Sequence, residues 1–432
     1  MPTSVNHGPG GTSLIGGADV DAVAAALPWT PSPGRATGDA TRGQMSSASL
    51  FMAFLKIGMT SFGMPAILHN VRTDAVERGV VTANEVDEGL ALVQLYPGPI
   101  MANLVTYIGH RHRGNAGAFA ATAGFLLPSL LAMLAAAAAL QHYAGQTGVR
   151  ALLWSLNAVV VGTVLNVTLD YGKKHLANLT QILLAVLAAV IALSGMNLLW
   201  AVAAGFVAGV CMTRRPVSVP VCRWPAPLRL RGLVVPLVLA AGLAMIAMVS
   251  GLSPRPLGDV TAAFMKIGSI AFGNGYTILP MIQKVAVVDH HWLSASQLGA
   301  AIGIAQFTPG PILNLATFVG FMAAGFVGAL AASLAIYAPS FVMTLFFAQA
   351  YQRLRHLDWI KGAIGGVLAA FVGMLVMVLA RLGEHALTGP FAVVVATLSF
   401  VALRYLKWSL PVIYLLVGAA VLAWSARSQF GG

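Results

Sequence analysis

The chain has 432 residues, of which 58% are hydrophobic and only 9% are charged, and its formal net charge is +12. A soluble globular chain carries roughly 25% charged residues, so a soluble fold of this size could not cover so much apolar surface. The composition predicts an integral membrane protein whose first partner is the lipid bilayer. The basic residues lie mostly in short loops between apolar runs, which argues against nucleic-acid binding.

Residues 1–47 are polar and rich in Gly and Pro, without a signal-peptide pattern, and we expect a disordered tail there. A first domain at 48–212 is followed by a basic linker with one connecting transmembrane helix at 213–256, and by a second domain at 257–427. The predicted fold is an all-α polytopic membrane protein with about thirteen membrane segments. These are the apolar runs at 50–68, 89–109, 117–140, 151–170, 179–193, 198–212, 233–250, 261–282, 297–320, 326–350, 362–380, 387–403 and 409–425.

The runs at 179–193 and 198–212 are shorter than the roughly 20 residues that a crossing needs, so two spans or one re-entrant hairpin both remain open. If every run crosses, 17 Lys and Arg residues lie in loops on the side of the N-terminus and 6 on the other side. The positive-inside rule then predicts the cytoplasmic (inner) membrane, with the N-terminus in the cytoplasm and the C-terminus outside.

The two domains repeat the same motifs. Phe54-Leu55-Lys56-Ile57-Gly58 matches Phe264-Met265-Lys266-Ile267-Gly268 at an offset of 210 residues, and Phe62-Gly63 matches Phe272-Gly273. Further on, Pro97-Gly98-Pro99-Ile100 matches Pro309-Gly310-Pro311-Ile312 at an offset of 212. Six runs and one connecting span separate the copies, so the second copy starts on the opposite face. This parity predicts an inverted repeat, an arrangement found in many secondary transporters.

Pro-Gly-Pro within an apolar run must break a helix, because proline removes backbone donors and glycine permits unusual torsion angles. A half-helix restarting at Ile100 would present free N–H groups and a positive dipole end, which together favour an anion. A simple packing kink is the alternative for a single copy. Two copies, each with a nearby Gln and Asn, favour a substrate site.

Lys56 and Lys266 are the basic residues within apolar runs, and we expect them to attract an anion. The alternative is that they extend to the membrane surface, since each lies near the start of its run. The acidic residues lie in the tail, in loops or near run ends, which also favours an anionic substrate. No metal site or cofactor is expected, since the two cysteines (Cys211 and Cys222) cannot build a cluster.

The segments 57–65, 272–280 and 306–320 resemble the chromate ion transporter family in its two-domain form, and the resemblance covers about residues 48–425. It implies two fused homologous domains of opposite topology that export chromate from the cytoplasm and confer chromate resistance, with sulfate as a related oxyanion. The family's Phe-Gly-Gly-Pro stands here as Phe62-Gly63-Met64-Pro65, and its Phe-Gly-Gly-Gly as Phe272-Gly273-Asn274-Gly275.

The leading hypothesis is a secondary active transporter of chromate or a related oxyanion, working as an efflux system. A passive anion channel, an uptake permease for another oxyanion, a membrane-embedded enzyme and a non-transporting sensor are the alternatives; no cluster of acid, base or nucleophile supports the enzyme. A homodimer is compatible with the sequence, and the oligomeric state stays open. The candidate substrate-binding residues are Lys56, Gly58, Ser61, Phe62, Gly63, Gln94, Pro97, Gly98, Pro99, Asn103, Lys266, Gly268, Phe272, Gly273, Asn274, Gly275, Tyr276, Gln306, Thr308, Pro309, Gly310, Pro311 and Asn314.

Overall fold

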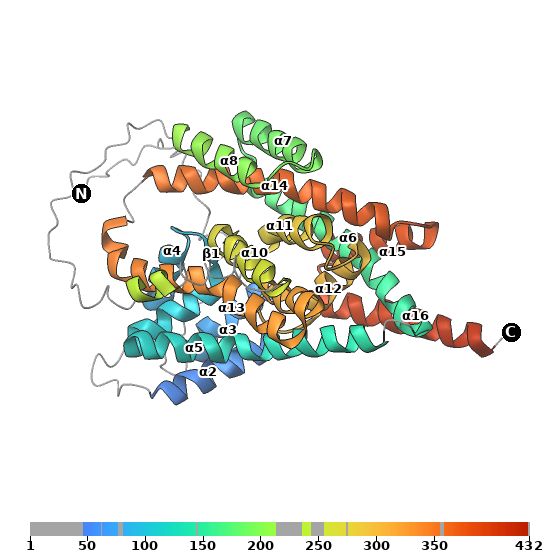
Figure 1. The fold of residues 1–432 in the computed structure, drawn as a ribbon, viewed down its shortest axis with the longest axis horizontal. Helices are drawn as coiled ribbons and strands as arrows, with labels where there is room; N and C mark the ends of the chain where they lie inside the picture. The colour runs from blue at the N-terminus through green and yellow to red at the C-terminus, as the bar shows by residue number, and fades with distance from the viewer. Residues whose placement is uncertain are drawn as a thin grey trace, which may run out of the picture. The chain divides into compact units, whose positions relative to one another are not determined.

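Helices make up nearly all of the described chain in a computed structural model of the protein (Figure 1). The structure describes residues 46–61, 63–76, 81–143, 146–212, 236–242, 255–273, 275–354 and 358–430. Almost all of the expected tail and most of the expected linker lie outside these residues, so the domain boundaries stay predictions.

The first repeat begins and ends with shorter helices, and its two longest helices lie in the middle. Its elements are α2 (Ser47–Thr60), α3 (Gly63–Asn70), the π-helix η1 (Val71–Ala75), α4 (Ala83–Val93), β1 (Gly98–Pro99), α5 (Ile100–Tyr143), α6 (Thr147–His175), α7 (Leu179–Leu193) and α8 (Leu199–Cys211).

The second repeat follows a similar order, but its strand comes directly after its first helix and it has an additional 3-10 turn after each break. Its elements are α10 (Leu257–Ile270), β2 (Phe272–Gly273), η2 (Tyr276–Ile278), α11 (Leu279–Gln283), η3 (Lys284–Asp289), α12 (Ala295–Phe307), η4 (Ile312–Asn314), α13 (Leu315–Leu354), α14 (Asp358–Ala386), α15 (Pro390–Arg404) and α16 (Leu410–Phe430).

The long helices α5 and α13 are each bent into two arms. Non-helical torsion angles occur at Arg113 and Gly114 in α5, and at Ala324 and Gly325 in α13. The glycines have φ values of +56° and +63°, a left-handed conformation that glycine adopts without strain. The bends divide α5 into a short arm (100–113) and a long arm (114–143), and α13 into a short arm (315–324) and a long arm (325–354).

The two arms of each bent helix lie against each other. Thr106 Oγ1 and Thr122 Oγ1 are 2.7 Å apart across the arms of α5. In α13, Thr317 Oγ1 and Ser333 Oγ are also 2.7 Å apart. These four side chains are buried, so each hydroxyl pair satisfies polar groups that have no access to water.

The short arm of α5 also packs against α4. A Cβ added at Gly89 of α4 would lie 2.7 Å from both Leu104 and Tyr107 of the short arm. Because Gly89 lies as far before Pro97 in the sequence as Tyr107 lies after Pro99, α4 and the short arm form a hairpin with the break at its tip.

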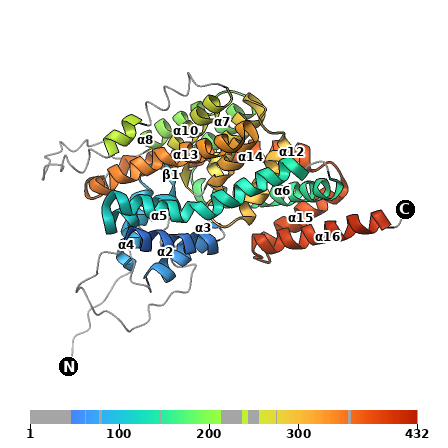
Figure 2. The same ribbon diagram turned by 60° about the horizontal axis from the view of Figure 1, so that its bottom comes forward.

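The chain that leaves α2 turns back in a similar way. The side-chain amide of Asn70, at the end of α3, donates a hydrogen bond of 2.9 Å to Ser61 Oγ, just after α2. In both Figure 1 and Figure 2, α2 lies along α5, where Gly58 allows contact with the carbonyl oxygen of Phe125. Arg72 Nη2 and Asp87 Oδ1, 2.7 Å apart, connect this turn to α4.

The two repeats insert their hairpins from opposite ends of the helix bundle. At one end, Trp154 near the start of α6 stacks on Phe391 of α15, with ring centroids 5.7 Å apart. Gly299 of α12 lies against Asn157 of α6, so the α12 hairpin starts at this end, which we call the second-repeat end. The long arm of α5 reaches the same end at Tyr143, just before α6, so its bend and the α4 hairpin lie at the first-repeat end. The repeat is therefore inverted, as predicted.

Four of the predicted membrane segments contain the breaks. The runs 50–68, 89–109, 261–282 and 297–320 are broken helices, as predicted, and the chain reverses direction at each break, which differs from the layout in which every run crosses (the straight-crossing layout). The physical reason is the helix-breaking motif within each run, which ends one helix and allows the next to leave at a new angle.

Helices α7 and α8 lie along α14 in both views (Figures 1 and 2). A Cβ added at Gly205 would lie 2.6 Å from the carbonyl oxygen of Gly366, and one at Gly209 would lie 2.2 Å from that of Gly362. α8 thus runs antiparallel to α14. The described stretch 179–212 is two separate helices joined by a short turn that points toward the second-repeat end.

Four helical stretches among the described residues are long and apolar enough to cross a membrane. Shorter apolar helices, such as α7, α8 and α15, accompany them. These features make the protein an integral membrane protein of broken and bent helices. The long stretches are Ile100–Tyr143, Leu152–His175, Ile312–Ala348 and Gly362–Ala386.

Candidate functional site

The Pro-Gly-Pro segment of each repeat meets the Phe-Gly break of the other repeat. The backbone N–H of Gly98 donates to the carbonyl oxygen of Ala271 at 2.5 Å, and β1 pairs with β2 in parallel. The N–H of Gly310 donates to the carbonyl oxygen of Ser61 at 2.8 Å. Since Ser61 and Ala271 are repeat equivalents, as are Gly98 and Gly310, the two contacts are reciprocal. We call this pair of contacts the crossover.

The crossover requires glycine at both positions. Gly98 has φ +144° and Gly310 has φ +105°, which side chains rarely allow. A Cβ added at Gly98 would lie 2.3 Å from Asn103 Nδ2 and 2.6 Å from Ser340 Cβ. At Gly310 it would lie 2.7 Å from Ser129 Cβ. Each glycine therefore lets its break pack directly against a long arm of the opposite repeat.

Helices restart immediately after both Pro-Gly-Pro segments. α5 begins at Ile100, directly after Pro99, and the short helix η4 begins at Ile312, directly after Pro311. The first N–H groups of a helix have no intrahelical partner and carry the positive end of the helix dipole. Two positive helix ends thus begin at the crossover, as the sequence predicts.

Buried side-chain donors surround the crossover. Asn103 Nδ2, Asn314 Nδ2, Gln306 Nε2 and Ser129 Oγ are buried and have no hydrogen-bond partner within the described part of the chain. A buried donor without a partner costs about 1–3 kcal/mol, so these groups favour a ligand that accepts hydrogen bonds.

Two tyrosines fix how the amides point. Tyr337 Oη donates to Asn314 Oδ1 at 2.9 Å, and Tyr414 Oη donates to Gln306 Oε1 at 2.8 Å. Because each amide oxygen accepts from a phenol, the NH₂ group of each amide is left to donate elsewhere. The site therefore offers donors, which is the pattern that an anion without protons requires.

Hydroxyl contacts also join the two repeats beside the breaks. Tyr96 Oη donates to Thr344 Oγ1 at 2.7 Å, and the repeat-equivalent pair, Thr308 Oγ1 and Met133 Sδ, is 3.7 Å apart. Each pair connects a break in one repeat to the long arm of the other. The breaks are thereby held by both repeats at once.

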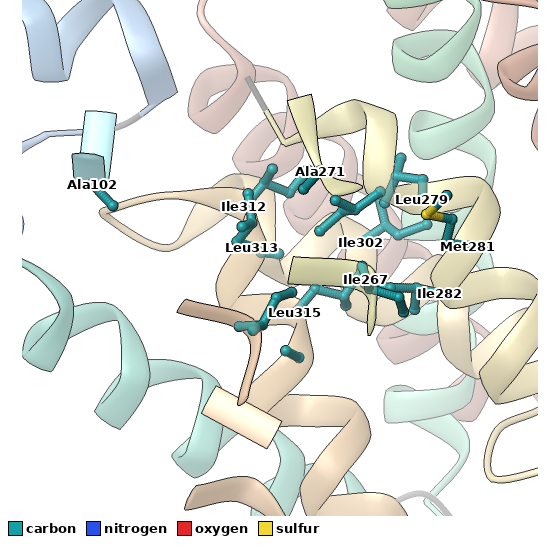
Figure 3. Close-up of a cluster of buried hydrophobic side chains, with 14 of the residues drawn as sticks. Ala102, Ile267, Ala271, Leu279, Met281, Ile282, Ile302, Ile312, Leu313 and Leu315 are labelled. Atoms are coloured by element: carbon teal, nitrogen blue, oxygen red, sulfur yellow. The ribbon is translucent and has the colours of Figure 1, made fainter. Parts of the chain in front are cut away.

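Apolar side chains surround the crossover on the side of the second repeat. Figure 3 shows Ala271, Ile302, Ile312, Leu313 and Leu315 packed together near the break, and all five are buried. Electrostatic interactions are stronger in such a region of low dielectric constant than in water.

Both lysines lie away from the crossover, on exposed faces of their helices. Lys56 is on the same face of α2 as Met52 and Met59, which are also exposed. Lys266 lines a hollow of about 300 Å³ together with Lys284. Neither lysine is therefore brought to the two Pro-Gly-Pro breaks.

Two further candidates serve helix packing in this structure. A Cβ added at Gly58 would lie 2.4 Å from the carbonyl oxygen of Phe125, and one at Gly268 would lie 2.1 Å from that of Ile336. These glycines let α2 and α10 approach the long arms closely.

The remaining candidates lie at the breaks or beside them. Phe62 and Asn274 fall outside the described residues, and for Gly63 the structure describes the backbone only. Gly275, with φ +90°, is buried against Ile312. The half-buried ones are Gln94, Pro97, Phe272, Gly273, Tyr276, Thr308, Pro309 and Pro311, and Pro99 is buried.

Ser129, Ser340, Tyr337 and Tyr414 were not among the predicted site residues. The serines carry a sequence signal, since Pro128-Ser129 matches Pro339-Ser340 between the repeats. The tyrosines carry none, because each lies in an apolar helix and belongs to no motif that is repeated between the two domains. Among the described residues, no group of three His, Cys, Asp or Glu side chains could hold a metal ion.

Comparison with known proteins adds independent findings. The profile of one protein family, described as chromate transporter, matches residues 48–210 and 258–424, which correspond to the two repeats. A chromate transport protein of Cupriavidus metallidurans is 30% identical over 380 residues, covering 86% of this chain and 91% of that protein. A probable chromate transport protein of Synechococcus elongatus is 28% identical over 389 residues, covering 88% and 96%. An uncharacterised transporter of Methanocaldococcus jannaschii is 28% identical over 377 residues, covering 87% and 94%. No solved structure matches the chain.

Proposed function

The chain belongs to the chromate transporter family, and on that premise we propose that it moves chromate, or a closely related tetrahedral oxyanion, across the membrane by secondary active transport. The observation that carries the proposal is the crossover, where two helix N-termini begin and four buried side-chain donors lack a partner among the described residues. Chromate is a tetrahedral dianion that accepts hydrogen bonds on all four oxygens. It can satisfy donors from both repeats at once.

A site made of N–H and O–H donors suits transport better than permanent binding. Amide and hydroxyl donors each contribute modestly, whereas a buried lysine pair would hold a dianion far more tightly. Release on the opposite side of the membrane needs the weaker arrangement. The absence of a described lysine at the crossover agrees with this requirement.

The inverted repeat supports a mechanism of alternating access. Each break is held by contacts to the opposite repeat, through Gly98–Ala271 and Gly310–Ser61. A small rotation of one repeat against the other would lengthen the contacts on one side and preserve those on the other. In transporters with inverted repeats, motions of this kind expose a central site to the two sides in turn.

For the direction of transport we propose efflux across the inner membrane, with the N-terminus in the cytoplasm and the C-terminus outside. The orientation rests on the bias of Lys and Arg between the loops. The direction rests on the resemblance to proteins that confer chromate resistance.

The test is oxyanion flux into proteoliposomes, with chromate, sulfate and molybdate compared at equal concentration. We expect saturable chromate uptake that responds to an imposed proton gradient. Flux that saturates but ignores every ion gradient would indicate a passive channel. No flux of any of the three oxyanions would refute the proposed function.

A further inference from the structure

A hollow of about 300 Å³ lies beside the break of the second repeat. Its walls come from α10, from the α11–η3 segment and from the turn between α7 and α8, with mainly apolar side chains. Three charged side chains line it, namely Lys266, Lys284 and Asp289, and Asn197 adds a side-chain amide.

Positively charged side chains outnumber negatively charged ones in the hollow. Lys284 Nζ lies 3.0 Å from Asp289 Oδ1 and donates to the carbonyl oxygen of Gly195 at 3.2 Å. Lys266 provides a second ammonium group in the same hollow, so the lining carries a net charge of about +1 at neutral pH. Because most of the wall is apolar, these charges are less screened than charges in open water.

The hollow borders the element that forms the crossover. Ile267 and Ile270 of the last turn of α10 are part of its wall, and the next residue, Ala271, accepts the hydrogen bond from Gly98. An anion held by Lys266 would therefore sit one helical turn before the break. The turn of α7 and α8 that closes the hollow points toward the second-repeat end, which places the hollow on that side of the protein.

We propose that this hollow is a vestibule that binds the oxyanion between the crossover and the second-repeat end, with Lys266 as its anchor and the Lys284–Asp289 pair as its gate. The proposal rests on the proposed function for the identity of the ligand. A dianion entering the hollow competes with Asp289 for Lys284. When the anion is present, the ammonium group of Lys284 pairs with the anion in place of Asp289. When the anion leaves, Asp289 pairs with Lys284 again, so the vestibule does not retain the anion. The side chains that would do this were not predicted as a group, because η3, α10 and the α7–α8 turn are far apart in the sequence.

The experiment measures KM and maximal rate in oriented proteoliposomes, with chromate added on the side of the second-repeat end, for four variants. Lys266→Gln and Lys284→Gln should each raise KM roughly tenfold with a nearly unchanged maximal rate, because each removes a charge-assisted contact. Asp289→Asn should lower KM, since it frees Lys284 for the anion. The control is Lys174→Gln, at the exposed end of α6, which should change neither constant.

The opposite signs at Lys284 and Asp289 distinguish a gate from a structural ion pair. If both variants impair transport equally, the pair serves stability and the gate is refuted. Anionic lipid is the competing occupant, so the assay is repeated in phosphatidylcholine with and without phosphatidylglycerol. If the Lys266→Gln effect vanishes without the anionic lipid, the hollow binds lipid and the proposal is wrong.

Binding of labelled chromate to the purified protein in detergent separates the two proposals. Binding that weakens in Lys266→Gln while the wild type shows no flux would refute transport and retain the vestibule. Normal wild-type flux with unchanged KM in both lysine variants would refute the vestibule and retain transport.

Discussion

Adding a single methyl group at Gly98 should disable the crossover. In the Gly98→Ala variant the new Cβ would lie 2.3 Å from Asn103 Nδ2 and 2.6 Å from Ser340 Cβ, well inside van der Waals contact. Ser340 belongs to the long arm of α13, so the clash cannot be relieved by moving one side chain alone. Overpacking of this kind costs about 1–3 kcal/mol, and the φ of +144° adds about 1–3 kcal/mol of strain.

The matched control is Gly325→Ala at the bend of α13. Gly325 also has a positive φ, +63°, but a Cβ added there meets nothing within 4 Å. The Gly325→Ala variant therefore carries backbone strain alone, about 1–3 kcal/mol. The difference between the two variants in unfolding midpoint and in flux therefore reports on the contact between the break and the opposite repeat.

The assays are thermal unfolding of the detergent-solubilised protein and chromate flux in proteoliposomes. We expect Gly98→Ala to lower the unfolding midpoint more than Gly325→Ala and to reduce flux at least tenfold, since displacement of a binding group by about 1 Å can cost on the order of a hundredfold in rate. Gly310→Ala should have an effect of the same kind, because its Cβ would lie 2.7 Å from Cβ of Ser129, the repeat equivalent of Ser340. Equal midpoints and equal fluxes for Gly98→Ala and Gly325→Ala would show that the crossover does not depend on this close approach.

Three further outcomes follow from the site and the fold. Asn103→Asp replaces a buried donor with a carboxylate, so chromate flux should fall by about a hundredfold, and flux within twofold of wild type would remove Asn103 from the site. Tyr414→Phe deletes the donor to Gln306 Oε1 and frees the amide to turn, so KM should rise several-fold; an unchanged KM would mean that the amide is held by other contacts. In a cysteine-free background, a membrane-impermeant maleimide applied to intact cells should label Lys284→Cys and leave Arg72→Cys unlabelled, whereas the straight-crossing layout requires the reverse.

The repeat and its breaks could be predicted from sequence because their causes are local. Pro-Gly-Pro ends a helix in any context, and the offset between copies identifies Gly98 with Gly310. The structure confirms both half-helices that restart after the breaks. The pairing of each Pro-Gly-Pro segment with the opposite Phe-Gly segment was not predicted, since it depends on how whole repeats dock.

The lysines show what the sequence could not place. A lysine within an apolar run suggests an inward-facing charge, but the face of a helix is set by what packs against it. Gly58 and Gly268 contact the long arms through backbone atoms, and each lies two residues after its lysine. Two residues correspond to about 200° around a helix, so a buried glycine places that lysine on the opposite face. Lys56 and Lys266 are exposed for this reason.

The hairpins change the number of membrane crossings, but they leave the two repeats in opposite orientations. Four broken segments that reverse direction remove an even number of crossings, so the parity that inverts the second repeat is preserved. With the N-terminus in the cytoplasm, as we propose, the same change exchanges the sides of two ion-paired groups: it places Arg72 on the cytoplasmic side and Lys284 on the outer side. Lys284 then lies on the side of the α7–α8 turn, as its hydrogen bond to Gly195 requires; the straight-crossing layout would place these two residues on opposite faces of the membrane. Because the two repeats insert their breaks from opposite sides, each side of the membrane faces the base of one repeat's hairpins, and the crossover lies between the two sets of hairpin tips.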